Sequence, residues 1–362
     1  MCQSFFLETQ WPCGYNFLKM KKQWLFPEYY SAFSCKADQC RNTCCSSWRI
    51  PVSKKEYNAL ITMECSEELN RRVQGAFVMP DFVSDDTYRY VSFNWLGNCP
   101  IQDKGLCALH REKGEGYLPK TCRLYPRSLK QINDTLFASC SGSCEKVAEI
   151  LYENKSLNIL EGELDAKPEL FYTVEDDDIT QILAIQDVMK EENMDLPAKI
   201  AKVCQMINAE EFVKDYDCNR EVLSDAIALL KRLSGDNVIL NEVCEESEKR
   251  YGQNPDLYYK DAKEFEERFS DHRGFFGRMI NNSMMYECFP FVDKRTDKTA
   301  AYRGLCICYG LLRLVCIVYC LERRKKEDLI DAVCALFRLI DHTAFYYNVS
   351  VLAENAAVFL KM

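Results

Sequence analysis

The chain has 362 residues, of which 48% are hydrophobic and 28% charged, and this composition excludes a disordered, collagen-like or low-complexity protein. Its 46 Lys and Arg residues stand against 55 Asp and Glu residues, so the formal net charge is −9. We therefore expect no nucleic-acid partner, because neutralising phosphates requires a basic surface.

Residues 1–19 precede a second methionine, Met20, which begins the sequence MKKQWLFPEYY. The stretch lacks the basic start and the apolar run of a secretory signal peptide. We expect residues 1–19 to be a disordered or mispredicted N-terminal extension. We also expect a cytoplasmic protein, whose thiols are reduced or bound to metal.

The next part of the chain, residues 20–150, predicts short and mixed elements. Ser53 and Glu56 form a capping-box pattern and predict a helix to about Glu64. Ser66, followed by two glutamates, predicts a second helix. Alternation over residues 87–94 predicts a strand, and residues 129–132 and 135–139 predict a hairpin around Asn133-Asp134.

From residue 145 onward, apolar residues recur at spacings of three and four, which predicts a series of helices. We expect them over residues 145–153, 179–192, 196–208, 220–234, 241–251, 257–270, 299–322 and 328–339. The most apolar stretch, residues 305–321, is short for a membrane span and contains Arg313 in its middle. We expect a buried core helix there and no membrane partner.

Together these elements predict an α+β fold. A small irregular cysteine-rich metal-binding domain is expected over residues 20–150, and a mainly α-helical domain over residues 151–362. The length suits two domains.

Cysteine is the outlier of the composition, with 21 residues, ten of which lie between Cys35 and Cys144. Most of these ten lie in turn-rich segments, where thiolates from distant positions can converge. Convergent thiolates in a reducing compartment indicate tetrahedral zinc or an iron–sulfur cluster. Cys65 ends a helix pattern and is the expected bystander. The nine candidate metal ligands are Cys35, Cys40, Cys44, Cys45, Cys99, Cys107, Cys122, Cys140 and Cys144.

The spacing of these cysteines leaves the metal and its ligand set open. The region has no C-x2-C knuckle of a zinc ribbon, and the adjacent pair Cys44-Cys45 is unusual for either metal. For a single cluster we favour Cys40, Cys44 and Cys45 together with Cys107 or Cys122, with Cys99 next. Cysteines packed as small hydrophobes, or a metal with a purely structural role, are the alternatives.

Signatures of other enzyme classes are missing from the sequence. The chain contains no Gly-rich dinucleotide fingerprint and no P-loop. It also lacks the Cys-x3-Cys-x2-Cys run of radical-forming clusters. A cluster in this chain is therefore expected to be fully ligated by protein.

With these motifs in hand, residues 20–145 resemble the flagellin lysine-N-methylase family. The resemblance implies methyl transfer from S-adenosylmethionine to lysine side chains of flagellin. It also implies a [4Fe-4S] cluster held by the cysteine blocks, with Zn²⁺ as the alternative. The matching motifs are FPEYY at 26–30, FSC at 33–35, CRNTCCSSWRI at 40–50, CP at 99–100, GLC at 105–107, CRLYPR at 122–127 and SCSGSC at 139–144.

The implied reaction makes two demands on the site. A lysine ammonium has a pKa of about 10.4, so its deprotonation near neutral pH costs about 4 kcal/mol. The sulfonium cation of the donor favours aromatic rings or carboxylates around it. We expect Tyr29 and Trp48 to contribute rings, unless they pack around the metal. Arg123 and Arg127 are expected to pair with the carboxylate of the donor or to balance the charge of the cluster.

The sequence predicts no catalytic residue and no oligomeric state. A non-catalytic zinc- or iron–sulfur-binding module with a structural, redox or interaction role is the alternative function.

Overall fold

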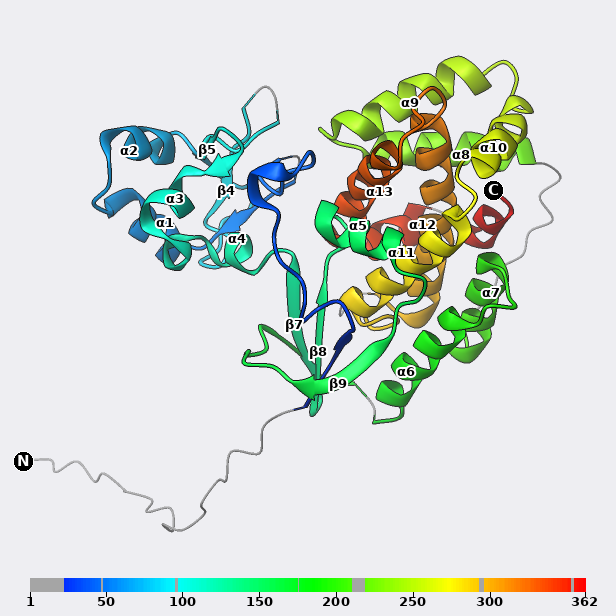
Figure 1. The fold of residues 1–362 in the computed structure, drawn as a ribbon, viewed down its shortest axis with the longest axis horizontal. Coiled ribbons are helices and arrows are strands. Elements are labelled where there is room, and N and C mark those ends of the chain that lie inside the picture. The colour runs from blue at the N-terminus through cyan, green and yellow to red at the C-terminus, as the bar shows by residue number, and fades with distance from the viewer. Residues whose placement is uncertain are drawn as a thin grey trace, which may run out of the picture.

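The computed structural model in Figure 1 describes residues 23–46, 48–94, 97–174, 176–209, 219–292, 296–352 and 355–362. It is an α+β fold in which helices dominate. Residues 35–124 form a small lobe of short elements, beside a larger helical part, and a sheet lies next to both (Figure 1). The expected extension over residues 1–19 lies outside the described residues.

Local capping signals place the helices of the small lobe. The Ser53 side chain accepts a hydrogen bond from Glu56 N at 3.3 Å, and the Glu56 carboxylate accepts one from Ser53 N at 2.8 Å. Ser66 caps the next helix through Leu69 N, so both predicted helix starts are confirmed. The elements of the small lobe are η1 (Ala37–Gln39), β2 (Pro51–Val52), α1 (Lys54–Thr62), α2 (Glu67–Gln74), β3 (Phe77–Val78), β4 (Arg89–Val91), β5 (Gln102–Asp103), β6 (Leu106–Cys107), α3 (Ala108–Lys113), η2 (Glu115–Tyr117) and α4 (Lys120–Leu124).

The small lobe has a hydrophobic core of its own. Its buried residues come from β2, α1, α2, β4 and α3 and from the connecting segments next to them. They are Ile50, Val52, Leu60, Leu69, Val73, Ala76, Val91, Cys99, Ile101, Ala108 and Leu109.

The main sheet has the strand order β10-β7-β8-β1-β9. β7 (Arg127–Ile132) and β8 (Thr135–Cys140) form the predicted hairpin, with Asn133 in its turn at a φ of 50°. β1 (Gln23–Pro27) lies parallel to β8 and antiparallel to β9 (Ile159–Glu163), and β10 (Leu170–Tyr172) lies parallel to β7. The sheet thus contains strands from both sides of residue 150, where the sequence predicts a domain boundary.

The helices pack around α12 (Lys298–Tyr319), which contacts α9, α13, α14 and η3. By length and composition α12 could cross a membrane, and 94% of its most apolar 18-residue window is buried inside the fold. This burial matches the expected core helix. The buried Arg313 on α12 donates hydrogen bonds to Glu266 at 2.8 Å and to the Met362 carbonyl at 2.9 Å, so its charge is compensated.

Most of the helices follow the predicted positions, and α5 matches its predicted range. The sequence predicts no helix over α11 or α14. These helices are α5 (Glu145–Glu153), α6 (Asp176–Lys190), α7 (Leu196–Met206), α8 (Asn219–Leu233), α9 (Val238–Tyr251), α10 (Leu257–Arg268), α11 (His272–Glu287), α13 (Lys326–Asp341), α14 (Phe345–Leu352) and the short η3 (Ala356–Lys361).

Two glycines in helices predict opposite effects of the same substitution. A methyl group at Gly304 of α12 would overlap the ring of Tyr346, whereas one at Gly277 of α11 would meet nothing within 4 Å. We expect Gly304→Ala to destabilise the protein by about 1–3 kcal/mol through overpacking. Gly277→Ala should stabilise it by about 0.5–1 kcal/mol, because alanine favours the helix. Urea unfolding of the two variants measures both signs, and equal shifts would contradict the close packing of α12 against α14.

Candidate functional site

Four of the nine predicted ligands border the core of the small lobe: Cys45, Cys99, Cys107 and Cys122, here called the small-lobe thiols. Cys99 N donates a hydrogen bond to Cys45 O at 2.8 Å, and Cys122 lies on α4. Burial raises the pKa of Cys99 to about 12, and negative charge on Cys45 and Cys107 adds to the rise. The pKa of Cys122 is raised well above its usual value by burial and then by the charges of the other three. Because such like-charge effects weaken with distance, the four thiols are neighbours.

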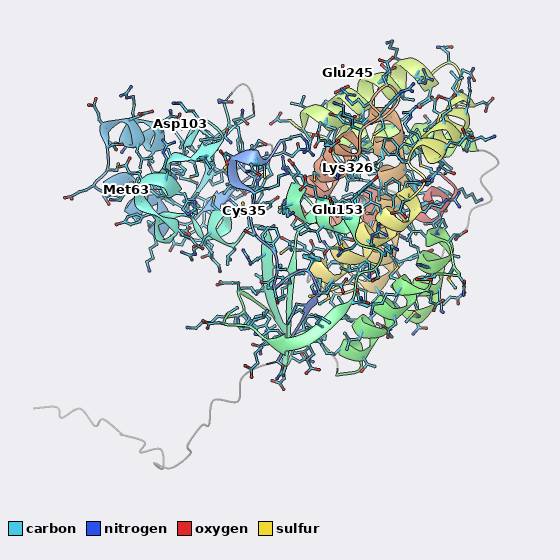
Figure 2. All side chains as sticks on the ribbon, in the orientation of Figure 1. Cys35, Met63, Asp103, Glu153, Glu245 and Lys326 are labelled. Carbon is cyan, nitrogen blue, oxygen red and sulfur yellow. The ribbon has the colours of Figure 1, made fainter. Side chains whose placement is uncertain are left out.

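A second set of four lies where the small lobe meets α5: Cys35, Cys40, Cys140 and Cys144, here called the junction thiols. Cys140 ends β8, and Cys144 immediately precedes α5. Burial raises the pKa of Cys40 to about 12, with further contributions from the charges of Glu145, Cys144 and Cys35. In Figure 2, Cys35 lies on the side of the small lobe toward α5, while Met63 and Asp103 lie away from it.

Cys44 lies between the two sets. Its thiol shares a hydrogen bond with Cys45, and this bond raises the pKa of Cys44 while burial raises it further. The same hydrogen bond lowers the pKa of Cys45 to about 7, so Cys45 is the more acidic thiol of the pair. The charges of Cys122 and Cys144 also raise the pKa of Cys44. Cys44 therefore lies within reach of one thiol from each set.

The structure divides eight of the nine cysteines between two neighbourhoods, with Cys44 between them. Within the described residues, no three His, Cys, Asp or Glu side chains adopt an arrangement that could hold a metal ion. The charges of Cys35 and Cys144 raise the pKa of Cys40. In the other set, the charges of Cys45 and Cys107 raise the pKa of both Cys99 and Cys122. The ligand set itself therefore stays a prediction.

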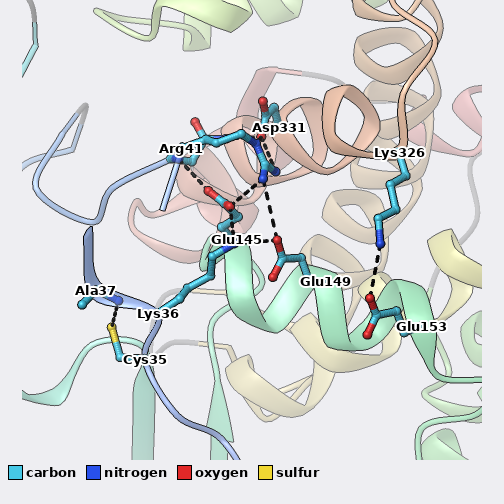
Figure 3. A network of polar contacts seen from close by, with 10 residues as sticks. Cys35, Lys36, Ala37, Arg41, Glu145, Glu149, Glu153, Lys326 and Asp331 are labelled. Atoms are coloured by element: carbon cyan, nitrogen blue, oxygen red, sulfur yellow. Dashed lines mark hydrogen bonds and ion pairs between the residues drawn. The ribbon is translucent and has the colours of Figure 1, made fainter. Parts of the chain in front are cut away.

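A network of charged residues fastens the segment of Cys35 and Cys40 to the helices (Figure 3). The buried Glu145 carboxylate accepts hydrogen bonds from Lys36 Nζ at 2.7 Å and from Asn42 N at 2.7 Å, and it pairs with Arg41 at 2.9 Å. Arg41 also pairs with Asp331 of α13 at 3.1 Å. Burial disfavours ionisation of Glu145, but the hydrogen bonds from Asn42 and Lys36 outweigh it and hold the pKa of this carboxyl below its usual value.

Glu145 is expected to carry most of the stability of this network. Glu145→Gln should destabilise the protein by about 2–3 kcal/mol, because its side chain is fully buried and satisfies three donors. Glu149→Gln is the matched control on the same helix. It should lose about 1 kcal/mol or less, since Glu149 is 19% exposed. Urea unfolding near neutral pH measures both losses, and a larger loss for Glu149→Gln would contradict this assignment.

The four predicted cofactor-binding residues lie in different surroundings. The Trp48 ring lies 4.3 Å from His342 and 5.8 Å from Tyr125, centroid to centroid, at a partly exposed position. Tyr29 is buried and donates hydrogen bonds to Asn282 and to the Cys140 carbonyl. Arg127 lies over the Phe33 ring, and its charge acts against the burial that raises the pKa of Cys140.

The charge of Arg123, by contrast, lowers the pKa of Glu56 in the small lobe. Arg127 and Trp48 therefore lie near the junction between the lobes, and Arg123 lies apart from them. The aromatic residue Trp95, adjacent to the cysteine blocks in sequence, lies outside the described residues.

Sequence reasoning missed a buried polar network at the same junction. The Asp341 carboxylate accepts hydrogen bonds from Ser141 Oγ at 2.6 Å, Gly142 N at 2.9 Å and Ser283 Oγ at 3.0 Å. Burial, and then the charge of Glu287, raise its pKa to about 7 against the lowering effect of these donors. The signals in the sequence were the Ser-Gly-Ser turn between two cysteines and the Asp-His pair that ends α13.

His342 extends this network toward the aromatic rings. Its Nε2 atom lies 2.7 Å from Ser143 Oγ, and Ser143 Oγ lies 3.1 Å from the Tyr125 hydroxyl. Burial lowers the pKa of His342 to about 3, and the Arg338 charge adds to this effect. The imidazole is therefore neutral at physiological pH.

Comparison with known proteins identifies a matching family and two similar proteins. A family model described as the FliB lysine N-methylase C-terminal domain matches residues 170–355, which run from β10 to beyond α14. Lysine-N-methylases of Salmonella typhimurium and Salmonella choleraesuis are each 25% identical over 122 residues. The match covers 33% of this chain and 30% of each relative, so it spans less than a third of their length. No solved structure matches the chain.

Proposed function

Because the chain belongs to the FliB lysine N-methylase family, we propose that it is a protein-lysine N-methyltransferase of the cytoplasm. The proposed methyl donor is S-adenosylmethionine, and the proposed substrate is flagellin. The observation that carries the proposal is the family match over residues 170–355. This range includes Ser283, Asp341 and His342 of the buried polar network.

The chemistry of this reaction suits the groups at the junction. The lysine nitrogen must lose a proton before its lone pair attacks the sulfonium methyl group. A cation at this face would lie near the rings of Trp48 and Tyr125, which favours both the ammonium and the sulfonium group. Of the two arginines considered, Arg127 is the better partner for the carboxylate of the donor, because it lies at the junction and Arg123 does not.

For the metal, we propose a [4Fe-4S] cluster held by the small-lobe thiols Cys45, Cys99, Cys107 and Cys122. Four thiols that influence one another's pKa fit the donor set of such a cluster. When bound, the cluster would supply an electron-transfer centre and folding free energy to the small lobe. The junction thiols are the second candidate set, and Zn²⁺ is the alternative metal.

The proposed activity is tested with the full chain, purified anaerobically with its metal content measured. Incubation with methyl-labelled S-adenosylmethionine and flagellin should transfer label to lysine side chains. Flagellin with chemically blocked lysines is the control and should stay unlabelled. Absence of transfer by fully metal-loaded protein would overturn the enzyme assignment and favour a non-catalytic metal-binding module.

A further inference from the structure

A continuous chain of short hydrogen bonds runs from the partly exposed His342 to the buried Asp341. The distance from His342 Nε2 to Ser143 Oγ is 2.7 Å, from Ser143 Oγ to Ser141 Oγ 2.7 Å, and from Ser141 Oγ to Asp341 Oδ2 2.6 Å. All three are close to the ideal length of a hydrogen bond. The two serines lie in the turn between β8 and α5, and the two end groups are the last residue of α13 and its C-cap.

When Asp341 is ionised, counting donors fixes the direction of every bond in this chain. Ser141 has one hydroxyl proton, which it donates to Asp341, so it must accept from Ser143 Oγ. Ser143 then has no proton left for His342, so it accepts from the Nε2–H group of the neutral imidazole. Its second lone pair accepts from the Tyr125 hydroxyl. In every bond, therefore, the donor is the group nearer to His342 and the acceptor is the group nearer to Asp341.

The two ends of the chain differ in the way that proton transfer requires. Within the described residues, no lysine or arginine forms an ion pair with Asp341, so protonation is its main route to neutrality. At the other end, His342 is only partly buried, and its Nδ1 atom has no hydrogen-bond partner among the described residues. A proton can thus arrive at Nδ1 while the Nε2 proton leaves toward Ser143.

From this geometry we propose that His342, Ser143, Ser141 and Asp341 form a proton relay that deprotonates the substrate lysine. The inference rests on the proposed function and adds residues that act in it. The lysine ammonium gives a proton to His342 Nδ1. The Nε2 proton moves to Ser143, the Ser143 proton to Ser141, and the Ser141 proton to the Asp341 carboxylate.

The methyl transfer that follows balances without any further reactant. The neutral lysine nitrogen forms a bond to the methyl carbon of a sulfonium donor, while the sulfur–carbon bond breaks and its electron pair stays on sulfur. The products are a methylated ammonium group and a neutral thioether. Asp341 then returns its proton to water along the same path.

The surroundings of Asp341 suit a carboxyl group that changes its charge. Its pKa of about 7 lets it accept a proton near neutral pH. The titratable or charged groups that act on it or are influenced by it are Glu287 from α11, Cys308 from α12, Tyr346 from α14 and Tyr29 beside β1. Serine hydroxyls complete its contacts from the β8–α5 turn and from α11.

The relay is tested by its rate, because loss of any hydrogen bond to Asp341 would change its equilibrium pKa. Time-resolved infrared spectroscopy after a pH jump follows the protonated carboxyl band of Asp341, which Asp341→Asn identifies. Ser143→Ala cuts the chain and should slow protonation about tenfold or more. Ser143→Thr keeps a hydroxyl and should restore the rate. Ser283→Ala is the matched control, because it removes a buried serine donor from the same carboxylate and leaves the chain intact.

Equal protonation rates in Ser143→Ala and Ser283→Ala would overturn the relay. Ser141→Ala cuts the next link and replaces Ser143→Ala if that variant does not fold. The infrared experiment needs no methyl transfer, so the two proposals fail separately. Slow protonation in Ser143→Ala without any labelling of flagellin would support the proton path to Asp341 and refute both the enzyme assignment and the role of this path in lysine deprotonation. Where flagellin is labelled, Ser143→Ala should also lose the multi-proton solvent isotope effect that Ser283→Ala keeps.

Discussion

Replacing Cys122 by serine is expected to remove nearly all bound metal from the protein. Cys122 is linked by charge to the other three small-lobe thiols, and serine is a poor ligand for iron or zinc. A structural metal contributes on the order of 10 kcal/mol to folding. The small lobe should therefore become sensitive to limited proteolysis, while the helical part, with its separate core, stays resistant. Metal and acid-labile sulfide analysis of anaerobically purified protein measures the loss.

Two further serine variants make this prediction sharp. Cys65 borders the same core but lies outside the proposed ligand set. The Cys65→Ser variant should therefore keep its metal. Cys144→Ser changes a buried junction thiol, and this variant should also keep its metal if the small-lobe thiols are the ligands. Loss of metal in Cys144→Ser with retention in Cys122→Ser would assign the site to the junction thiols. Stoichiometric zinc without sulfide would replace the cluster by a zinc site.

The second large effect is expected from Asp341→Asn, as a change in the pH dependence of stability. The pKa of Asp341 is about 7 in the folded protein, against an ordinary value of about 3.9 in an unfolded chain. Between these two values the folded state holds a proton that the unfolded state has released. Wild-type stability therefore falls as the pH rises from about 4 to about 7, by up to about 4 kcal/mol from this group.

Asparagine does not titrate, so this decline should disappear in the variant. Urea unfolding of both proteins between pH 5 and pH 8 measures this effect. As the pH rises over this range, the unfolding free energy of wild type should fall by roughly 3 kcal/mol relative to that of Asp341→Asn. Glu287→Gln is the matching control, because removing this nearby negative charge should lower the pKa of Asp341 and reduce the decline. Parallel curves for wild type and Asp341→Asn would show that Asp341 does not titrate in this range.

Local signals allowed much of the fold to be predicted from the sequence. α5 has its predicted bounds, and the Ser53 and Ser66 caps begin their helices where expected, because these features depend on residues three or four positions apart. α11 was missed because glycines and buried polar residues interrupt its apolar periodicity, among them Arg278 and Asn282. The pairing of β1 with β8 joins residues more than a hundred positions apart, and no local pattern encodes it.

The grouping of the cysteines could not be predicted from the sequence. The cysteine count pointed to the segment that the proposed metal site uses, yet the division into small-lobe and junction thiols depends on tertiary contacts. Asp341 was missed because a single aspartate carries no signal until Ser141, 200 positions earlier in the chain, is placed beside it. His342 was missed for the same reason, since the Trp48 ring comes from the small lobe and the Tyr125 ring from the residue that follows it.

The placement of β1 has a consequence for the order of events during synthesis. β1 is complete at Pro27, but its partner strands end only at Cys140 and Glu163, so the whole small lobe is an insertion between neighbouring strands of one sheet. All four small-lobe thiols leave the ribosome before β8 exists. The small lobe can therefore fold, and acquire a metal, on a nascent chain whose sheet is still open. Closing β1 between β8 and β9 then locks an already assembled lobe onto the helices that follow.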